Sequence, residues 1–150
     1  MAPGTYVLII EVPKDVTFFV GSLGEIKIKK GALLYVGSGL NGVEKRIMRH
    51  FRREKKRHWH IDYITSILQP KIAVYIVDER KLEDAVAKEL LSNHHLTPIL
   101  GFGATDSKLS THLFWGENVD ILLTIASNIL EKIGGKKPRM FFAKHFPENR

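Results

Sequence analysis

Four short segments rich in β-branched and aromatic residues occupy the first 37 residues, and glycines or prolines separate them. The segments are 5–12, 16–20, 25–29 and 32–37. Runs of this kind, bounded by turn-forming residues, are typical of β-strands. The connections between them are too short for crossover helices, so we expect antiparallel pairing. This pattern constrains the fold more than any other part of the sequence.

After residue 40 the spacing of the apolar residues changes to the period of a helix. We expect helices at 42–53, 59–68, 81–92 and 119–133, and strands at 72–77 and within 99–116. Strands followed mostly by helices predict an α+β fold, in which helices flank a small antiparallel or mixed β-sheet. We expect residues 1–116 to form the main domain. Residues 117–150 should add a C-terminal helix and a basic tail packed on that domain.

The tail, residues 136–150, is basic and aromatic. We expect it to become ordered only on contact with a partner or with a second copy of the chain, which leaves a homodimer open. Because no segment approaches the ~20 apolar residues that span a bilayer, we expect no membrane partner. The start of the chain lacks the features of a signal peptide, so we expect a cytoplasmic protein.

Basic residues dominate the charge of the chain. The formal net charge is +7, the pI is about 9.7, and the 150 residues include no cysteine. The absence of cysteine excludes disulfides, thiol catalysis and cysteine-based metal sites. A basic balance of this size favours polyanionic partners, of which nucleic acid is the main class.

The expected helix at 42–53 combines an apolar stripe with a cationic outer face. Val43, Ile47 and Phe51 recur at helical spacing, and a basic run at 52–57 follows. Clustered cations of this kind are suited to phosphate contacts, and an adjacent tryptophan can stack on a base. The predicted nucleic-acid contacts are Lys45, Arg49, Arg52, Arg53, Lys55, Lys56, Arg57 and Trp59.

Two glycine–tyrosine tripeptides lie about thirty residues apart. They are Gly4-Thr5-Tyr6 and Tyr35-Val36-Gly37, and Arg46 and His50 follow on the expected helix. Phosphodiester cleavage needs an activated water and positive charge at the phosphate. A tyrosine hydroxyl could orient the water, and the planar fork of Arg46 could hold the phosphate. His50 lies one helical turn from Arg46, so both side chains can face one site.

This ordered set resembles the GIY-YIG nuclease superfamily. Gly4 and Tyr6 match the first family element, Tyr35 and Gly37 match the second, and Arg46 matches the helix arginine. His50 matches a histidine that some members carry. The best match for the metal-binding glutamate of the family is Glu83, with Glu79, Asp84 and Glu89 as rivals. The resemblance implies an endonuclease that uses Mg²⁺ or Mn²⁺ and acts on DNA in preference to RNA, in repair or recombination.

The likeness extends to a largely archaeal branch of that superfamily, some of whose members are fused to a DNA-repair enzyme of the endonuclease three type. It runs from residue 4 to about residue 115. The segments that carry it are Tyr35–Ser38, Arg49-His50, Trp59–Tyr63, Gly101–Gly103 and His112–Phe114. Ser38 departs from several bacterial relatives, which have a lysine there, so one phosphate contact is expected to be missing.

The segment from His58 to Asp62 allows other interpretations. With His112, the residues His58, His60 and Asp62 could build a zinc site for a hydrolase. Alternatively, His60 and Asp62 hydrogen-bond to each other or to the backbone and anchor the start of a helix, which we favour. A third hypothesis is a nucleic-acid-binding module that keeps the fold without cutting. It predicts binding that needs no metal.

Overall fold

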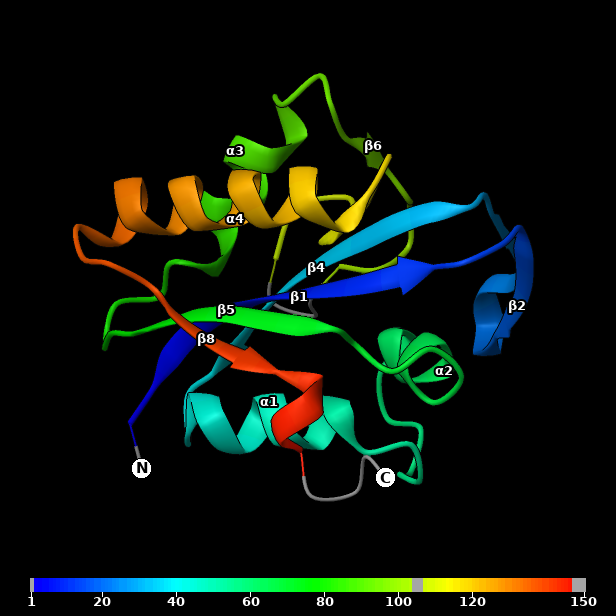
Figure 1. Ribbon diagram of the computed structural model, residues 1–150, viewed down its shortest axis with the longest axis horizontal. Helices are drawn as coiled ribbons and strands as arrows, with labels where there is room; N and C mark the ends of the chain where they lie inside the picture. The colour runs from blue at the N-terminus through cyan, green and yellow to red at the C-terminus, as the bar shows by residue number, and fades with distance from the viewer. Residues whose placement is uncertain (1, 104–106, 147–150) are drawn as a thin grey trace.

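The computed structural model describes residues 2–103 and 107–146 and confirms an α+β fold (Figure 1). Six strands form the main sheet in the order β6-β7-β4-β1-β5-β8, and every pair is antiparallel. In chain order these strands are β1 (Gly4–Val12), β4 (Gly31–Gly39), β5 (Ile72–Val77), β6 (Thr97–Pro98), β7 (Leu113–Gly116) and β8 (Arg139–Phe142).

Strand β1 is buried on both faces, which explains its continuous run of apolar residues. Val7 and Ile9 face α4 (Val119–Gly134), which with α3 (Glu83–Leu91) covers one face of the sheet. Tyr6 and Leu8 face α1 (Val43–Phe51) on the opposite face, beside which lies α2 (His60–Thr65). Figure 1 shows the two helical layers on either side of the sheet. Tyr6 is therefore directed toward the cationic helix.

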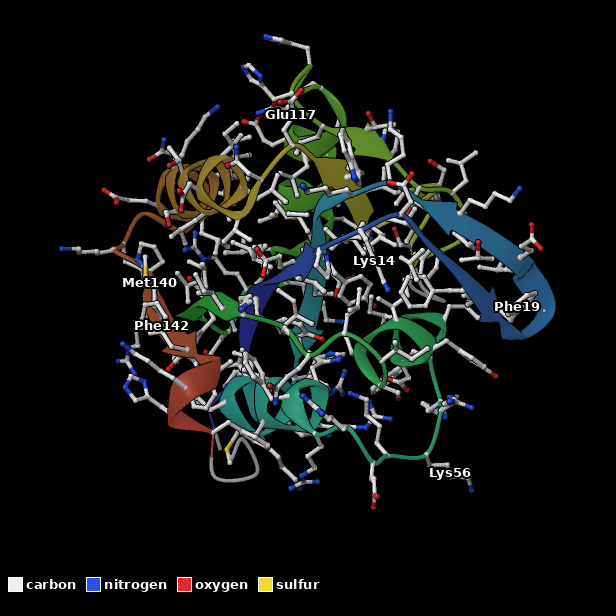
Figure 2. The ribbon with its side chains drawn as sticks, turned by 45° about the vertical axis from the view of Figure 1, so that its right-hand side comes forward. Lys14, Phe19, Lys56, Glu117, Met140 and Phe142 are labelled. Atoms are coloured by element: carbon white, nitrogen blue, oxygen red, sulfur yellow. The ribbon has the colours of Figure 1, made fainter. Side chains whose placement is uncertain are left out.

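The middle two of the four N-terminal strands form a separate hairpin. Strands β1 and β4 pair along their whole length, from Gly4 opposite Gly39 to Val12 opposite Gly31. The connection between them contains β2 (Val16–Val20) and β3 (Gly24–Ile28), which pair only with each other. Phe19 lies on this hairpin with 71% of its surface exposed (Figure 2). Because β1 and β4 hold the glycine–tyrosine elements, their direct pairing brings the two elements together.

The expectation that the tail needs a partner to become ordered is wrong for its described part. Residues 139–142 form β8 on the edge of β5, with Tyr75 opposite Arg139. Phe146 is 4% exposed and packs its ring against Phe51 of α1 at a centroid distance of 5.9 Å. Strand pairing and aromatic burial within the chain therefore order this segment. Residues 147–150 lie outside the described residues.

The helices are short. Within the ranges 2–103 and 107–146, none is both long and apolar enough to cross a membrane.

Candidate active site

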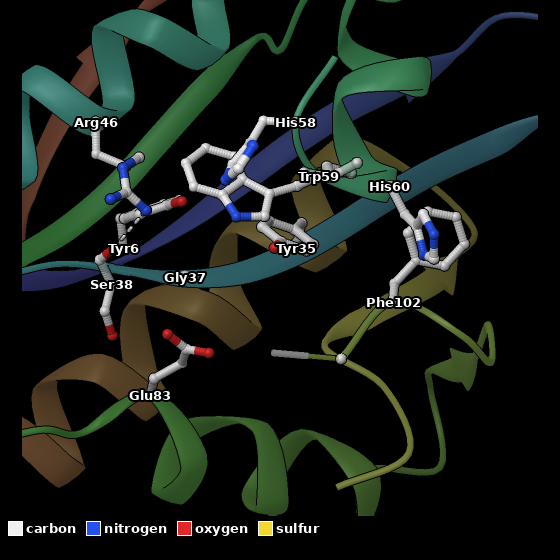
Figure 3. A pocket seen from close by; sticks show the side chains of 12 residues that line it. Tyr6, Tyr35, Gly37, Ser38, Arg46, His58, Trp59, His60, Glu83 and Phe102 are labelled. Carbon is white, nitrogen blue, oxygen red and sulfur yellow. Dashed lines mark hydrogen bonds between the residues drawn. The ribbon is translucent and has the colours of Figure 1, made fainter. Parts of the chain in front are cut away.

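A pocket of about 260 Å³ opens where β1 and β4 meet α1 and the start of α3 (Figure 3). Most of its lining residues were predicted as site residues, although they come from distant parts of the chain. The lining consists of Tyr6, Tyr35, Gly37, Ser38, Arg46, His58, Trp59, His60, Ile61, Glu83, Phe102 and Gly103. Its residues Ile61, Phe102 and Gly103 were not predicted as site residues. Phe102 and Gly103 belong to the Gly-Phe-Gly segment, which was the only sequence signal for them.

Tyr6 and His50 form a buried pair behind the pocket. The Tyr6 hydroxyl lies 2.6 Å from Nε2 of His50, and the two side chains are 2% and 1% exposed. Burial raises the pKa of Tyr6 well above its ordinary value, and Tyr35 raises it further. Burial lowers the pKa of His50 to about 3, with help from Lys55 and the nearby arginines. At neutral pH both groups are therefore uncharged, and Nε2 of His50 can accept the Tyr6 proton in a hydrogen bond.

Gly4 and Gly37 are sites of close approach. Gly37 lies directly opposite Tyr6 in the strand register, and a Cβ at residue 37 would overlap the Tyr6 ring. A Cβ at Gly4 would overlap the carbonyl oxygen of Ile76. The tyrosine thus occupies the space in which a larger residue at 37 would place its side chain. This is a packing reason for glycine at both positions.

Arg46 extends from α1 over the mouth of the pocket. Its Nη1 donates to the carbonyl oxygen of Ser38 at 3.1 Å, and its guanidinium lies 4.5 Å from the centroid of the Trp59 ring. Figure 3 shows Arg46, Tyr6 and Ser38 together on one side of the pocket, across from Glu83. Tyr35, also in the pocket lining, has its pKa raised by burial and by the nearby carboxylate of Glu83. The guanidinium of Arg46 and the carboxylate of Glu83 thus lie on opposite sides of the pocket.

Glu83 is the carboxylate that faces the pocket among the four that the sequence left open. Glu89 instead pairs with Lys132 of α4 at 2.5 Å, and Glu79 is exposed. Asp84 lines a neighbouring hollow with Glu83. Both acids occupy the first turn of α3, where the helix dipole favours negative charge.

His112 approaches both acids from the opposite side. Its Nδ1 lies 2.9 Å from Oε2 of Glu83 and its Nε2 lies 3.3 Å from Oδ1 of Asp84. Burial lowers the pKa of His112, but the two carboxylates outweigh burial, so the pKa is raised above its ordinary value. Sequence reasoning named His112 for a different set and missed Asp84 as its partner.

The four residues of the zinc hypothesis do not converge. Asp62 is fully buried and accepts hydrogen bonds from the backbone N–H groups of His58 and Trp59 at 2.8 and 2.9 Å. His60 places its Nδ1 3.0 Å from the carbonyl oxygen of Gly101. In the described part of the chain, the one cluster of three metal-ligating groups is Glu83, Asp84 and His112. The favoured prediction, that Asp62 anchors the start of α2, is confirmed.

Arg49, one of the predicted nucleic-acid contacts, pairs with Asp62 while its side chain stays 24% exposed. Its two terminal nitrogens each donate to the Asp62 carboxylate at 2.9 Å, and the guanidinium lies 4.4 Å from the centroid of the Trp59 ring. Two guanidiniums thus already contact Trp59, which is only partly exposed. Lys55 donates to the carbonyl oxygen of His50 at 2.7 Å. Trp59 lines the pocket, and Arg49 and Lys55 lie beside it in a neighbouring hollow.

The remaining predicted cations are exposed beside the pocket. We call this set the basic face: Lys45, Arg52, Arg53, Lys56 and Arg57. Lys45, Arg52 and Lys56 share a hollow with Arg46, which places this part of the basic face next to the pocket mouth, whereas Arg53 and Arg57 line a separate hollow with Tyr63. An extended polyanion lying along these cations would reach Arg46 and the pocket.

Comparison with known proteins identifies one family. The family model described as a domain of unknown function, DUF123, matches residues 5–135. The match includes α4, which the resemblance seen in the sequence left out. No curated protein and no solved structure matches the chain.

Proposed function

The chain belongs to this DUF123 family, and we propose that it is a divalent-metal-dependent endonuclease of the GIY-YIG type that hydrolyses phosphodiester bonds in DNA. One observation carries the proposal. Tyr6 from β1, Arg46 from α1 and Glu83 from α3 reach one pocket, and the basic face borders it. A water-orienting hydroxyl, a phosphate-binding cation and a metal-binding carboxylate are the groups that phosphodiester hydrolysis requires.

Substrate binding would begin on the basic face. Exposed lysines and arginines attract the phosphate backbone whatever its sequence. Arg46 would then hold the reacting phosphate, because a guanidinium presents several donors in one plane and carries a positive charge. Its bond to the Ser38 carbonyl oxygen and its contact with Trp59 fix the direction in which those donors point.

Tyr6 would orient the attacking water. Its raised pKa keeps the hydroxyl protonated, and the neutral imidazole of His50 accepts that proton in a hydrogen bond. The oxygen lone pairs of Tyr6 are then available to a water in the pocket. A tyrosine held in this way acts by positioning and by relaying a proton, not as a preformed phenolate.

Glu83 fits a divalent cation, since its carboxylate faces the pocket opposite Arg46. A cation bound there would neutralise charge on the phosphate and on the departing oxygen. Glu83 would supply the negative charge that holds the cation, and its place in the first turn of α3 favours a carboxylate there.

The test is cleavage of labelled duplex, single-stranded, flapped and four-way-junction DNA with Mg²⁺ or Mn²⁺. Wild type should cut at least one of these substrates, and Glu83→Gln and Arg46→Ala should each lose cutting. Glu117→Gln and Lys88→Ala are matched controls on exposed positions outside the pocket. The proposal fails if wild type cuts nothing, or if the two pocket variants cut as well as the controls.

A non-catalytic nucleic-acid-binding module of the same fold is the second candidate. The observation that favours it is that Tyr6 and Tyr35 both have raised pKa values, so neither is a ready base at neutral pH. This candidate predicts equal DNA binding with Mg²⁺ and with a chelator, together with no cleavage of any substrate. Loss of binding on removal of the metal would argue against it.

A further inference from the structure

Glu83, Asp84 and His112 bring three metal-ligating groups together at the edge of the pocket. One ligand atom from each side chain lies within 4.8 Å of the other two. The carboxylates come from the first turn of α3, and the imidazole comes from the residue that precedes β7. Glu83 also lines the pocket, so the cluster and the pocket share one residue.

The buried imidazole is the feature that the nuclease proposal does not use. His112 is 0% exposed, and its Nδ1 has no hydrogen-bond partner among the described residues. Nε2 faces Asp84 at 3.3 Å and the hydroxyl of Ser107 at 3.4 Å. Nδ1 instead faces the Glu83 carboxylate at 2.9 Å. Nδ1 thus contacts a carboxylate without the alignment of a hydrogen bond, and a buried nitrogen beside a carboxylate is suited to bind an ion together with it.

The backbone holds this imidazole firmly in place. The His112 N–H donates to the carbonyl oxygen of Phe102 at 3.0 Å, and its own carbonyl oxygen accepts from the N–H of Val36 at 3.0 Å. The backbone of His112 is therefore hydrogen-bonded both to β4 and to Phe102, which lines the pocket. Ligands placed on a rigid backbone need little reorganisation when a metal ion binds.

We propose that Glu83, Asp84 and His112 bind a first-row transition-metal dication, such as Mn²⁺, in preference to Mg²⁺ and in the absence of nucleic acid. Imidazole nitrogen is a ligand for transition metals, whereas Mg²⁺ takes oxygen ligands and keeps several waters. Three protein ligands can hold such an ion without help from a phosphate. The inference rests on the proposed function for the role of Glu83, and it adds two ligands and the class of ion.

The first experiment titrates the full chain with Mn²⁺ alone and follows the electron paramagnetic resonance signal of the free ion. The chain should bind one Mn²⁺, and Mg²⁺ should displace it only in large excess. His112→Ala and Asp84→Asn should each weaken binding at least ~10-fold, which is the scale on which metal-site partners act. Glu89→Gln and His95→Ala are matched controls outside the cluster and should bind as wild type does.

The second experiment needs no variant, so it stays decisive if His112→Ala does not fold. Pulsed electron paramagnetic resonance of wild type with Mn²⁺ should show coupling to an imidazole nitrogen. Bound Mn²⁺ without that coupling, or no binding to the free chain, would overturn the proposal. If the chain shows the coupling but cuts no DNA, the metal site proposed here stands and the proposed nuclease function fails. If the chain cuts DNA with Mg²⁺ but lacks the coupling, the nuclease function stands and this metal site fails.

Discussion

The hydroxyl of Tyr6 lies 2.6 Å from Nε2 of His50, so that a residue of the central strand and a residue of the cationic helix share a buried hydrogen bond. This bond joins the sheet to α1 at the back of the pocket. It also decides which way the Tyr6 oxygen is directed. The stability of the fold and the chemistry proposed for the pocket therefore depend on the same pair.

Tyr6→Phe should remove the water-orienting hydroxyl while the aromatic ring stays in place. We expect cleavage to fall by about 10²–10⁴-fold, the usual scale for a proton-transfer group. The free energy of unfolding should fall by about 1–3 kcal/mol, because Nε2 of His50 is left buried without its partner. Single-turnover cleavage and urea unfolding measure the two effects. Tyr63→Phe, outside the pocket lining, should leave cleavage unchanged. Equal cleavage by Tyr6→Phe and wild type would contradict the assigned role.

Acid should destabilise the protein through His50. The folded pKa is lowered to about 3 from an ordinary value of 6.5, because burial disfavours the imidazolium. Below pH 6.5 the imidazole of His50 is therefore protonated in the unfolded chain, whereas it stays neutral in the folded chain. The contribution of neutral His50 to the free energy of unfolding is fully present above pH 6.5 and is lost as the pH falls toward 3. At one pKa unit per ~1.4 kcal/mol, about 2–3 kcal/mol should be gone by about pH 4.5.

Urea unfolding at several pH values between 7.5 and 4.5 tests the contribution of His50. Because carboxylates also titrate in acid, the informative quantity is the difference between wild type and His50→Gln. The variant should lose less stability than wild type over this range. His94→Gln, at an exposed histidine, is the control and should follow wild type. Parallel curves for all three proteins would show that His50 titrates normally.

Asp62→Ala should destabilise the start of α2, which lies beside the pocket. The Asp62 side chain is 0% exposed and accepts four hydrogen bonds, two from Arg49 and two from backbone N–H groups. Removing one partner of a buried ion pair typically costs about 3–5 kcal/mol. Denaturant unfolding should show a loss of this size, against less than ~1 kcal/mol for exposed Asp120→Ala. A loss no larger than that of the control would mean that Arg49 and the helix start do not depend on this carboxylate.

The basic face should contribute salt-dependent affinity without contributing to stability. We expect Lys45→Ala and Arg52→Ala each to reduce by about one the slope of log K against log salt concentration. Fluorescence anisotropy with labelled DNA at several salt concentrations measures the slope. Lys88→Ala, on the exposed face of α3, should leave the slope unchanged. Thermal unfolding should be the same for all four proteins. Slopes equal to wild type would place the DNA contact elsewhere.

Much of the fold could be predicted because its signals are local. The apolar run of β1 and the helical spacing of Val43, Ile47 and Phe51 each report burial of one strand or one helix face. Hydrophobic periodicity depends only on neighbours along the chain, so it can be read without knowing the partner surface.

The described part of the tail could not be predicted in this way. Strand β8 is four residues long and partly exposed, and its register depends on the edge of β5. A short edge strand carries little periodicity of its own. Only pairing with β5 and burial of Phe146 against α1 decide its structure.

The sequence by itself determined the strand and helix faces, the cationic surface and the identities of Tyr6, Arg46 and Glu83 as candidates. Only the tertiary structure decided which of those faces meet. It placed His50 against Tyr6, paired Arg49 with Asp62, and set His112 against Glu83 and Asp84. The physical reason is that periodicity specifies which side of an element is buried, while contacts between distant elements depend on sheet order and helix packing.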